Sequence, residues 1–112
     1  MTADEVRALV LSLPEVEQKS HFGTPDFRVR NKIISTLREA EGVAAVKVTR
    51  WEMEALAASD PGTFEAIPWG AQSWLKVRYA TVDPEQLREL FLEAWKMVTP
   101  AKMHALLLGT QK

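Results

Sequence analysis

The segment SWLKVRY, Ser73–Tyr79, places an aromatic ring and two cations at alternate positions. Successive side chains of a β-strand point to opposite faces, so the apolar positions of this segment would face a core. The side chains left on the other face are Trp74, Lys76 and Arg78. An indole can stack on a flat ring, and ammonium and guanidinium groups bind phosphates and carboxylates. The pattern therefore predicts a surface for an anionic ligand that contains a flat ring.

Two earlier segments extend the same predicted surface. In FRVR, residues 27–30, two arginines alternate with apolar residues, and in VKV, residues 46–48, a lysine lies between two valines. A nucleic acid or a nucleotide would suit such a face, whereas the plain alternative is a solvated face of an antiparallel sheet. The predicted nucleic-acid-binding set is Arg28, Arg30, Lys47, Trp74, Lys76 and Arg78.

A second candidate site combines a histidine and two tryptophans. His21 lies in KSHFGTPDFRV, residues 19–29, where Gly-Thr-Pro predicts a turn and the flanking Phe22 is expected to anchor the core. The histidine is either a structural hydrogen-bond donor for this loop or a titratable group at the rim of a pocket. With Trp69 and Trp74 it would form a corner for a small anionic ligand or a protein partner.

The residue types needed for catalysis or metal binding do not occur at suitable spacing. Ser20 directly precedes His21, so the two would point to opposite faces of a strand. The five glycines are isolated, and without cysteine the two histidines, 21 and 104, form no zinc motif. We therefore expect a binding module more than an enzyme, with no catalytic residue, no metal ligand and no cofactor, although spacing alone leaves a carboxylate-based catalytic site open.

The composition is that of an ordinary globular protein. The chain has 112 residues, 46% of them hydrophobic and 26% charged, and its formal net charge is −1. No global field would draw it to phosphate or lipid, so charge-driven binding needs a local patch. No apolar stretch is long enough for a membrane span, and the N-terminus lacks the basic character of a signal peptide. We expect one cytoplasmic domain with no membrane partner.

Hydrophobic periodicity predicts the elements that position these residues. Thr2 and Glu5 have the spacing of a capping box, and the apolar stripe that follows predicts a helix ended by Pro14. Asp83 and Pro84 begin the clearest helix. Residues 63–72 are expected to be irregular. The other predicted elements are strands over 27–30, 33–37, 43–48 and 73–79, a strand ending near residue 22, a helix over 51–59, and a terminal helix over 101–108 capped by Gly109.

This order of elements predicts a two-layer α+β fold. Its antiparallel sheet would have about five strands, with the helices packed on one face. One face of the sheet would then be buried against the helices, while the other would remain free for solvent or for a ligand.

Three motifs carry a family resemblance. HFGTPDF at 21–27, WGAQSW at 69–74 and VDPEQLRELFLEAWKMVTP at 82–100 together resemble the MmcQ/YjbR family of small bacterial proteins, mostly uncharacterised. The resemblance implies one MmcQ/YjbR-like domain over residues 1–112, with an α+β fold grouped with frataxin-like and secretion-chaperone-like proteins and described as double-wing and DNA-binding-like. It implies no known reaction. The carboxylates near the first helix are interrupted by apolar residues, so an iron surface is not expected.

Overall fold

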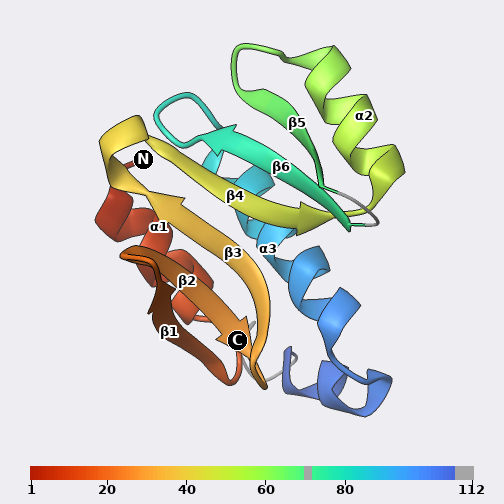
Figure 1. The fold of residues 1–112 in the computed structure, drawn as a ribbon. Coiled ribbons are helices and arrows are strands. Elements are labelled where there is room, and N and C mark those ends of the chain that lie inside the picture. The colour runs from red at the N-terminus through yellow and green to blue at the C-terminus, as the bar shows by residue number, and fades with distance from the viewer. Residues whose placement is uncertain (70–71, 108–112) are drawn as a thin grey trace.

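The computed structural model describes residues 1–69 and 72–107, without the side chains of Pro68 and Trp69. The elements form a sheet with helices on one side (Figure 1). In chain order they are α1 (Ala3–Leu11), β1 (Val16–His21), β2 (Thr24–Val29), β3 (Lys32–Arg38), the 3-10 turn η1 (Glu39–Glu41), β4 (Val43–Val48), α2 (Arg50–Ser59), β5 (Phe64–Trp69), β6 (Gln72–Arg78), α3 (Pro84–Val98) and η2 (Ala101–Ala105).

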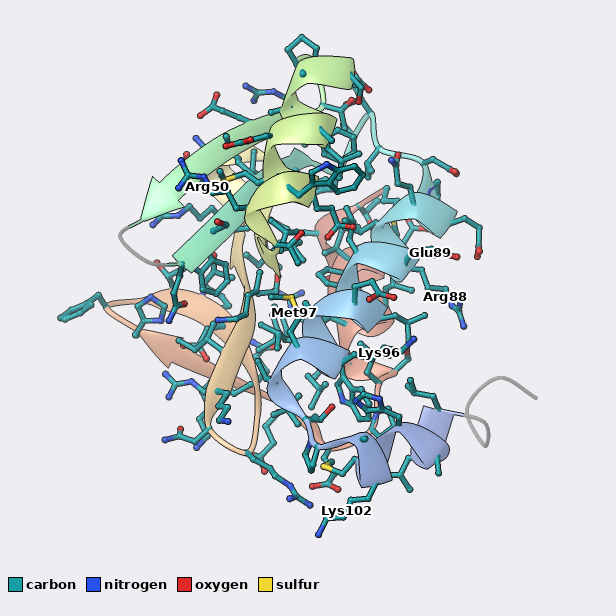
Figure 2. All side chains as sticks on the ribbon, turned by 90° about the vertical axis from the view of Figure 1, so that its right-hand side faces the viewer. Arg50, Arg88, Glu89, Lys96, Met97 and Lys102 are labelled. Atoms are coloured by element: carbon teal, nitrogen blue, oxygen red, sulfur yellow. The ribbon has the colours of Figure 1, made fainter. Side chains whose placement is uncertain are left out.

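The sheet has six strands in the order β1-β2-β3-β4-β6-β5, and every neighbouring pair is antiparallel. The chain leaves β4, forms α2 and β5, and returns as β6 between β4 and β5. Helix α3 packs on β3 and β4, and α2 packs on β5 and β6. The view along the sheet edge places α2 and α3 together on one side of it (Figure 2). The predicted α+β class with one helix-covered face is therefore confirmed.

Local capping explains where the first two helices begin. The Thr2 hydroxyl accepts a hydrogen bond from the Glu5 N–H at 3.2 Å, and the Glu5 carboxylate accepts one from the Thr2 N–H at 2.8 Å, so the predicted capping box is present. Helix α2 begins in the same way, because the Thr49 hydroxyl accepts a bond from the Glu52 N–H at 3.1 Å. The predicted cap of the terminal helix at Gly109 lies outside the described residues.

Strand β5 corrects the prediction that residues 63–72 are irregular. It pairs along its whole length with β6, from Phe64 opposite Val77 to Trp69 opposite Gln72. Proline usually argues against a strand because it cannot donate to the ladder. At the edge of a sheet one side of a strand has no partner, and β5 is one of the two edge strands, so Pro68 is tolerated there. The sheet consequently has six strands, where about five were predicted.

The core lies between the sheet and the helices α1 and α3. The inward residues of β2, such as Phe27 and Val29, are fully buried, as are Val6 and Val10 of α1. Trp95 of α3 is also fully buried, and its indole N–H donates to the Pro14 carbonyl at 2.8 Å. A buried indole needs such an acceptor, and this bond fixes the end of α3 to the loop between α1 and β1. The remaining fully buried large side chains are Phe91, Ile34, Leu37, Leu75, Leu87, Val46 and Val77.

The turn between β1 and β2 overturns the expectation that Phe22 anchors the core. Phe22 and Gly23 form a two-residue turn with φ of 49° and 79°, as type I′ hairpin turns require. Phe22 is fully exposed to solvent. A position at the tip of a hairpin cannot reach the core, whatever the residue type, and a positive φ costs a phenylalanine about 1–2 kcal/mol.

Replacing Phe22 by asparagine should therefore stabilise the protein. Asparagine tolerates a positive φ, and no packed ring is lost, so we expect the Phe22→Asn variant to raise the free energy of unfolding by about 1 kcal/mol. Urea titration followed by circular dichroism measures this. The control is Phe22→Ala, which removes the ring without relieving φ and should change stability by less than about 0.5 kcal/mol. Destabilisation by Phe22→Asn would show that the ring has a packing role.

Candidate functional site

The face of the sheet without helices carries four of the predicted binding residues together. Residues paired across antiparallel strands share a face, and Lys47 of β4 pairs with Trp74 of β6. Lys76 and Arg78 follow on β6 at alternate positions and so point the same way. No helix of the described residues covers this side, which faces the viewer in Figure 1. We call Lys47, Trp74, Lys76 and Arg78 the β4–β6 patch.

Lysine and tryptophan in this patch interact directly. The Lys47 ammonium lies 5.6 Å from the centroid of the Trp74 ring and donates a hydrogen bond to the Gln72 side-chain oxygen at 3.1 Å. At that distance a cation is attracted by the negative face of an indole. The two groups are half-buried against each other, which places a positive charge and a flat ring side by side on an uncovered sheet.

Acidic neighbours change how much positive charge this face presents. Lys76 forms an ion pair with Glu65 on the edge strand, with 3.3 Å between Nζ and the carboxylate oxygen. Arg78 is exposed, and among the described residues its guanidinium has no acidic partner. Within residues 1–69 and 72–107, the Lys47 ammonium contacts the side-chain amide of Gln72 and the Trp74 indole and has no acidic partner. The free positive charge of the patch therefore comes from Lys47 and Arg78.

Arg30 does not lie on the strand where the sequence placed it. Strand β2 ends at Val29, and Arg30 and Asn31 form the turn to β3 with φ of 49° and 67°. The strands predicted over 27–30 and 33–37 would have placed this turn at Asn31-Lys32, one residue later. The Arg30 guanidinium is 3.4 Å from a Glu15 carboxylate oxygen, so this cation is paired near the loop after α1. Its assignment to the outward face of the sheet was therefore wrong.

Arg28 lies on the predicted face but is held by a buried carboxylate. Asp26, two residues earlier on β2, is fully buried and accepts hydrogen bonds from Arg28 Nε at 2.7 Å and Nη2 at 3.0 Å. The remaining Arg28 nitrogen donates to the Asn31 side-chain oxygen at 3.0 Å. Such a bidentate pair is geometrically strong and leaves Arg28 little freedom to bind a ligand.

His21 is a third member of this group, and we call Asp26, Arg28 and His21 the Asp26 cluster. The His21 Nδ1 atom lies 2.7 Å from Asp26 Oδ2, the oxygen that also accepts from Arg28 Nη2, so Asp26 has partners on β1 and β2. The Arg28 hydrogen bonds, followed by that of His21, hold the pKa of Asp26 below its usual value against the opposing effect of burial. Asp26 in turn raises the pKa of Arg28. Asp26 was assigned to neither candidate site, although its spacing from Arg28 places both on one face of a strand.

The predicted corner of His21, Trp69 and Trp74 is not formed. Strands β2, β3 and β4 lie between β1, which carries His21, and β6, which carries Trp74. Neighbouring strands are about 4.8 Å apart, so roughly 19 Å separates the two strands. The backbone of Trp69 pairs with Gln72 near Trp74, but the side chain of Trp69 lies outside the described part. The sequence does not reveal the order of strands in the sheet, and it is this order that separates His21 from Trp74.

Within residues 1–69 and 72–107, no group of three or more histidine, cysteine, aspartate or glutamate side chains could hold a metal ion. None of the helices described there is long and apolar enough to cross a membrane. The His104 ring of η2 lies against the buried Trp95 ring, with 5.7 Å between the two ring centroids.

The family comparison now identifies the kind of protein. The model of the YjbR family matches residues 11–97, which is more than half of the chain. The chain belongs to the YjbR family. The match spans all six strands and α3 up to Met97 of this YjbR chain, so the family assignment includes the β4–β6 patch and the Asp26 cluster.

Solved structures support the fold of this YjbR chain. The protein DR2400 of Deinococcus radiodurans, with a domain described as DUF419, superposes with a TM-score of 0.75 at 22% identity. The superposition covers 90% of this chain and 80% of DR2400. At this identity the likeness shows the shared fold alone. No curated protein matches the chain.

The Asp26 cluster predicts a particular dependence of stability on pH. The pKa of Asp26 in the folded protein lies below its unfolded value of about 3.9. The ionised carboxylate therefore stabilises the folded state fully above that unfolded pKa, and this stabilisation is lost as pH falls through the folded pKa. The Asp26→Asn variant should have a free energy of unfolding about 2–4 kcal/mol lower at pH 7, because it leaves Arg28 without its buried partner. Below pH 3 the difference in the free energy of unfolding between the variant and the unmodified protein should shrink.

Urea titrations of both proteins at several pH values between 2.5 and 7 measure this difference. The matched control is Glu17→Gln, which removes an exposed carboxylate from the neighbouring strand and should leave the curve nearly unchanged. A difference that stays constant across the pH range would contradict an ionised Asp26 as the source of the stabilisation.

Proposed function

We propose that this YjbR-family chain is a non-enzymatic module that binds nucleic acid, DNA included, through the β4–β6 patch. The observation that carries the proposal is the Lys47 ammonium lying over the Trp74 ring on a sheet face that no described helix covers. A flat ring beside a cation offers stacking to a base and a charge to its phosphate. Unstacked bases of a single strand can reach such a ring, so single strands should bind better than duplexes.

The contacts that each cation already makes within the protein determine how much it should contribute to the affinity for nucleic acid. Arg78 and Lys47 have no carboxylate partner among the described residues and should contribute most. The Lys76 ion pair with Glu65 is partly exposed, and such pairs are worth about 1 kcal/mol or less, so Lys76 can exchange Glu65 for a phosphate. Arg28 should contribute little, because releasing it would leave the buried Asp26 unpaired.

The small number of free cations sets the expected strength. With two or three phosphate contacts, the logarithm of the binding constant should fall with the logarithm of salt concentration with a slope of about −1.5 to −2 for a single strand. The formal net charge of −1 adds no general attraction. Binding should therefore be weak at physiological salt and clear at low salt.

Fluorescence anisotropy of a labelled single-stranded oligonucleotide, titrated with the protein at low and physiological salt, tests this proposal. We expect the Lys47→Ala/Arg78→Ala variant to lose at least about tenfold in affinity with a shallower salt slope, and Trp74→Ala to lose stacking. The matched control, Arg88→Ala/Lys102→Ala, also removes one arginine and one lysine, but from the helix side of the molecule (Figure 2), and should bind normally.

Two outcomes would overturn nucleic-acid binding by this patch. The first is the absence of binding even at low salt. The second is an equal loss of affinity in the sheet-face and helix-side variants, which would mean that only overall charge matters. The alternative of a small-ligand or protein site at the His21 corner gains no support, because strand order keeps its members apart.

A further inference from the structure

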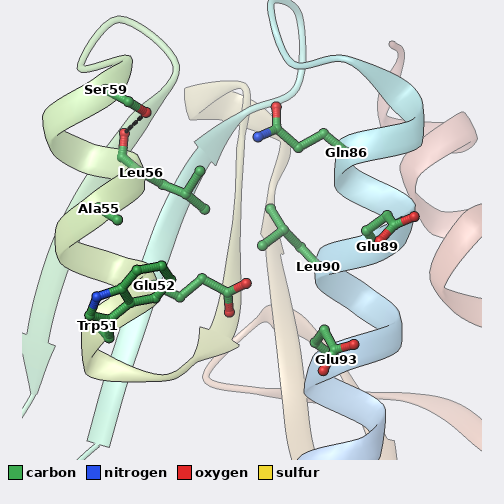
Figure 3. A pocket seen from close by; sticks show the side chains of 9 residues that line it. All are labelled: Trp51, Glu52, Ala55, Leu56, Ser59, Gln86, Glu89, Leu90 and Glu93. Carbon is green, nitrogen blue, oxygen red and sulfur yellow. Dashed lines mark hydrogen bonds between the residues drawn. The ribbon is translucent and has the colours of Figure 1, made fainter.

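A groove lies between α2 and α3 (Figure 3). It is on the helix-covered side of the sheet (Figure 2) and therefore opposite the β4–β6 patch. Its volume is about 370 Å³. It exists because α2 packs on β5 and β6 while α3 packs on β3 and β4, so the two helices rest on different strands and leave a furrow between them. We call it the α2–α3 groove.

The walls of the groove are apolar. Leu56 of α2 and Leu90 of α3 extend toward each other across it (Figure 3). Trp51, in the first turn of α2, lines one end, and its side chain is 79% exposed. An indole left in water beside two leucines offers stacking and dispersion contacts to a ring of about its own size. A half-open apolar groove of this volume suits a small organic molecule better than a metal ion or water alone.

The charged side chains that line the groove are all negative in the described part of the chain. Three carboxylates line it, those of Glu52, Glu89 and Glu93, and no lysine or arginine is among its lining residues in the described part of the chain. Figure 3 shows the Glu52 side chain directed from α2 toward α3. Burial and the nearby Glu93 raise the pKa of Glu52. Among the described residues, Glu93 has one ion pair, an exposed one with Lys96 at 3.7 Å, and no ion pair involves Glu52 or Glu89, so most of this negative charge is uncompensated there.

We propose that the α2–α3 groove binds a small organic cation, namely an ammonium group carried by an apolar body of about one ring. The apolar part would lie between the two leucines and the Trp51 indole, and the ammonium would meet the carboxylates of Glu52 and Glu93. Indole faces and carboxylates together are the usual partners of ammonium ligands, since both attract a cation. An anion of the same shape would be repelled.

Three probes of one shape separate charge from apolar contact. Phenethylammonium is the cation, 2-phenylethanol its neutral counterpart and 3-phenylpropionate the anion. Titrations monitored by ¹H–¹⁵N correlation spectra follow the Trp51 indole N–H and the backbone amides of α2 and α3. We expect a roughly millimolar dissociation constant for the cation, as is usual for a fragment, at least tenfold weaker binding of the alcohol, and none of the anion.

Paired variants test the role of the carboxylates. Glu52→Gln/Glu93→Gln should reduce the affinity for the cation to that of the alcohol. The raised pKa of Glu52 means that folding disfavours its ionised form, so neutral glutamine at pH 7 should not destabilise the protein. Glu54→Gln/Glu85→Gln removes two charges from the same helices at exposed positions outside the groove and should leave binding unchanged.

Three results would overturn the proposal. These are equal binding of the cation and the alcohol, shifts confined to residues outside the groove, and an equal effect of the two paired glutamate variants. The site is independent of the sheet face, so Trp51→Ala should abolish the ammonium response while leaving oligonucleotide anisotropy unchanged.

Discussion

The pairing of β4 with β6 is the constraint on which the rest of the structure depends. Val46 lies opposite Leu75 and Ala44 opposite Val77, and all four are buried against the helices. A slip of one residue would turn this apolar set outward, so the core fixes the register. The same register places Lys47 beside Trp74 on the other face. Core packing therefore assembles the candidate site, although none of the site residues contributes to the core.

The return of the chain as β6 also creates the second candidate site. Because β6 lies between β4 and β5, helix α2 must rest on β5 and β6, beside α3 and not on top of it. The α2–α3 groove follows from this arrangement. The two proposed sites consequently lie on opposite sides of one sheet, and they differ in charge as well as in position, with carboxylates in the groove and free cations in the patch.

Counting charges along the sequence overestimated the basic surface. Of five cations assigned to the sheet face, Arg28 is bound by Asp26, Lys76 is paired with Glu65, and Arg30 lies in a turn near Glu15. Each partner comes from a different place: Asp26 from the same strand, Glu65 from the edge strand and Glu15 from the loop after α1. A near-zero net charge thus hides two local surfaces of opposite sign.

The sequence by itself determined what short-range chemistry controls. The capping box at Thr2, the proline at the start of α3 and the alternation in β4 predicted these elements. Each of these signals depends on residues only a few positions apart. The family resemblance was also readable there. Tertiary structure alone decided that β5 is a strand, that Phe22 is exposed, that Asp26 holds His21 and Arg28, and that a groove opens between α2 and α3. These features depend on strand order and on partners distant in sequence, which no local pattern encodes.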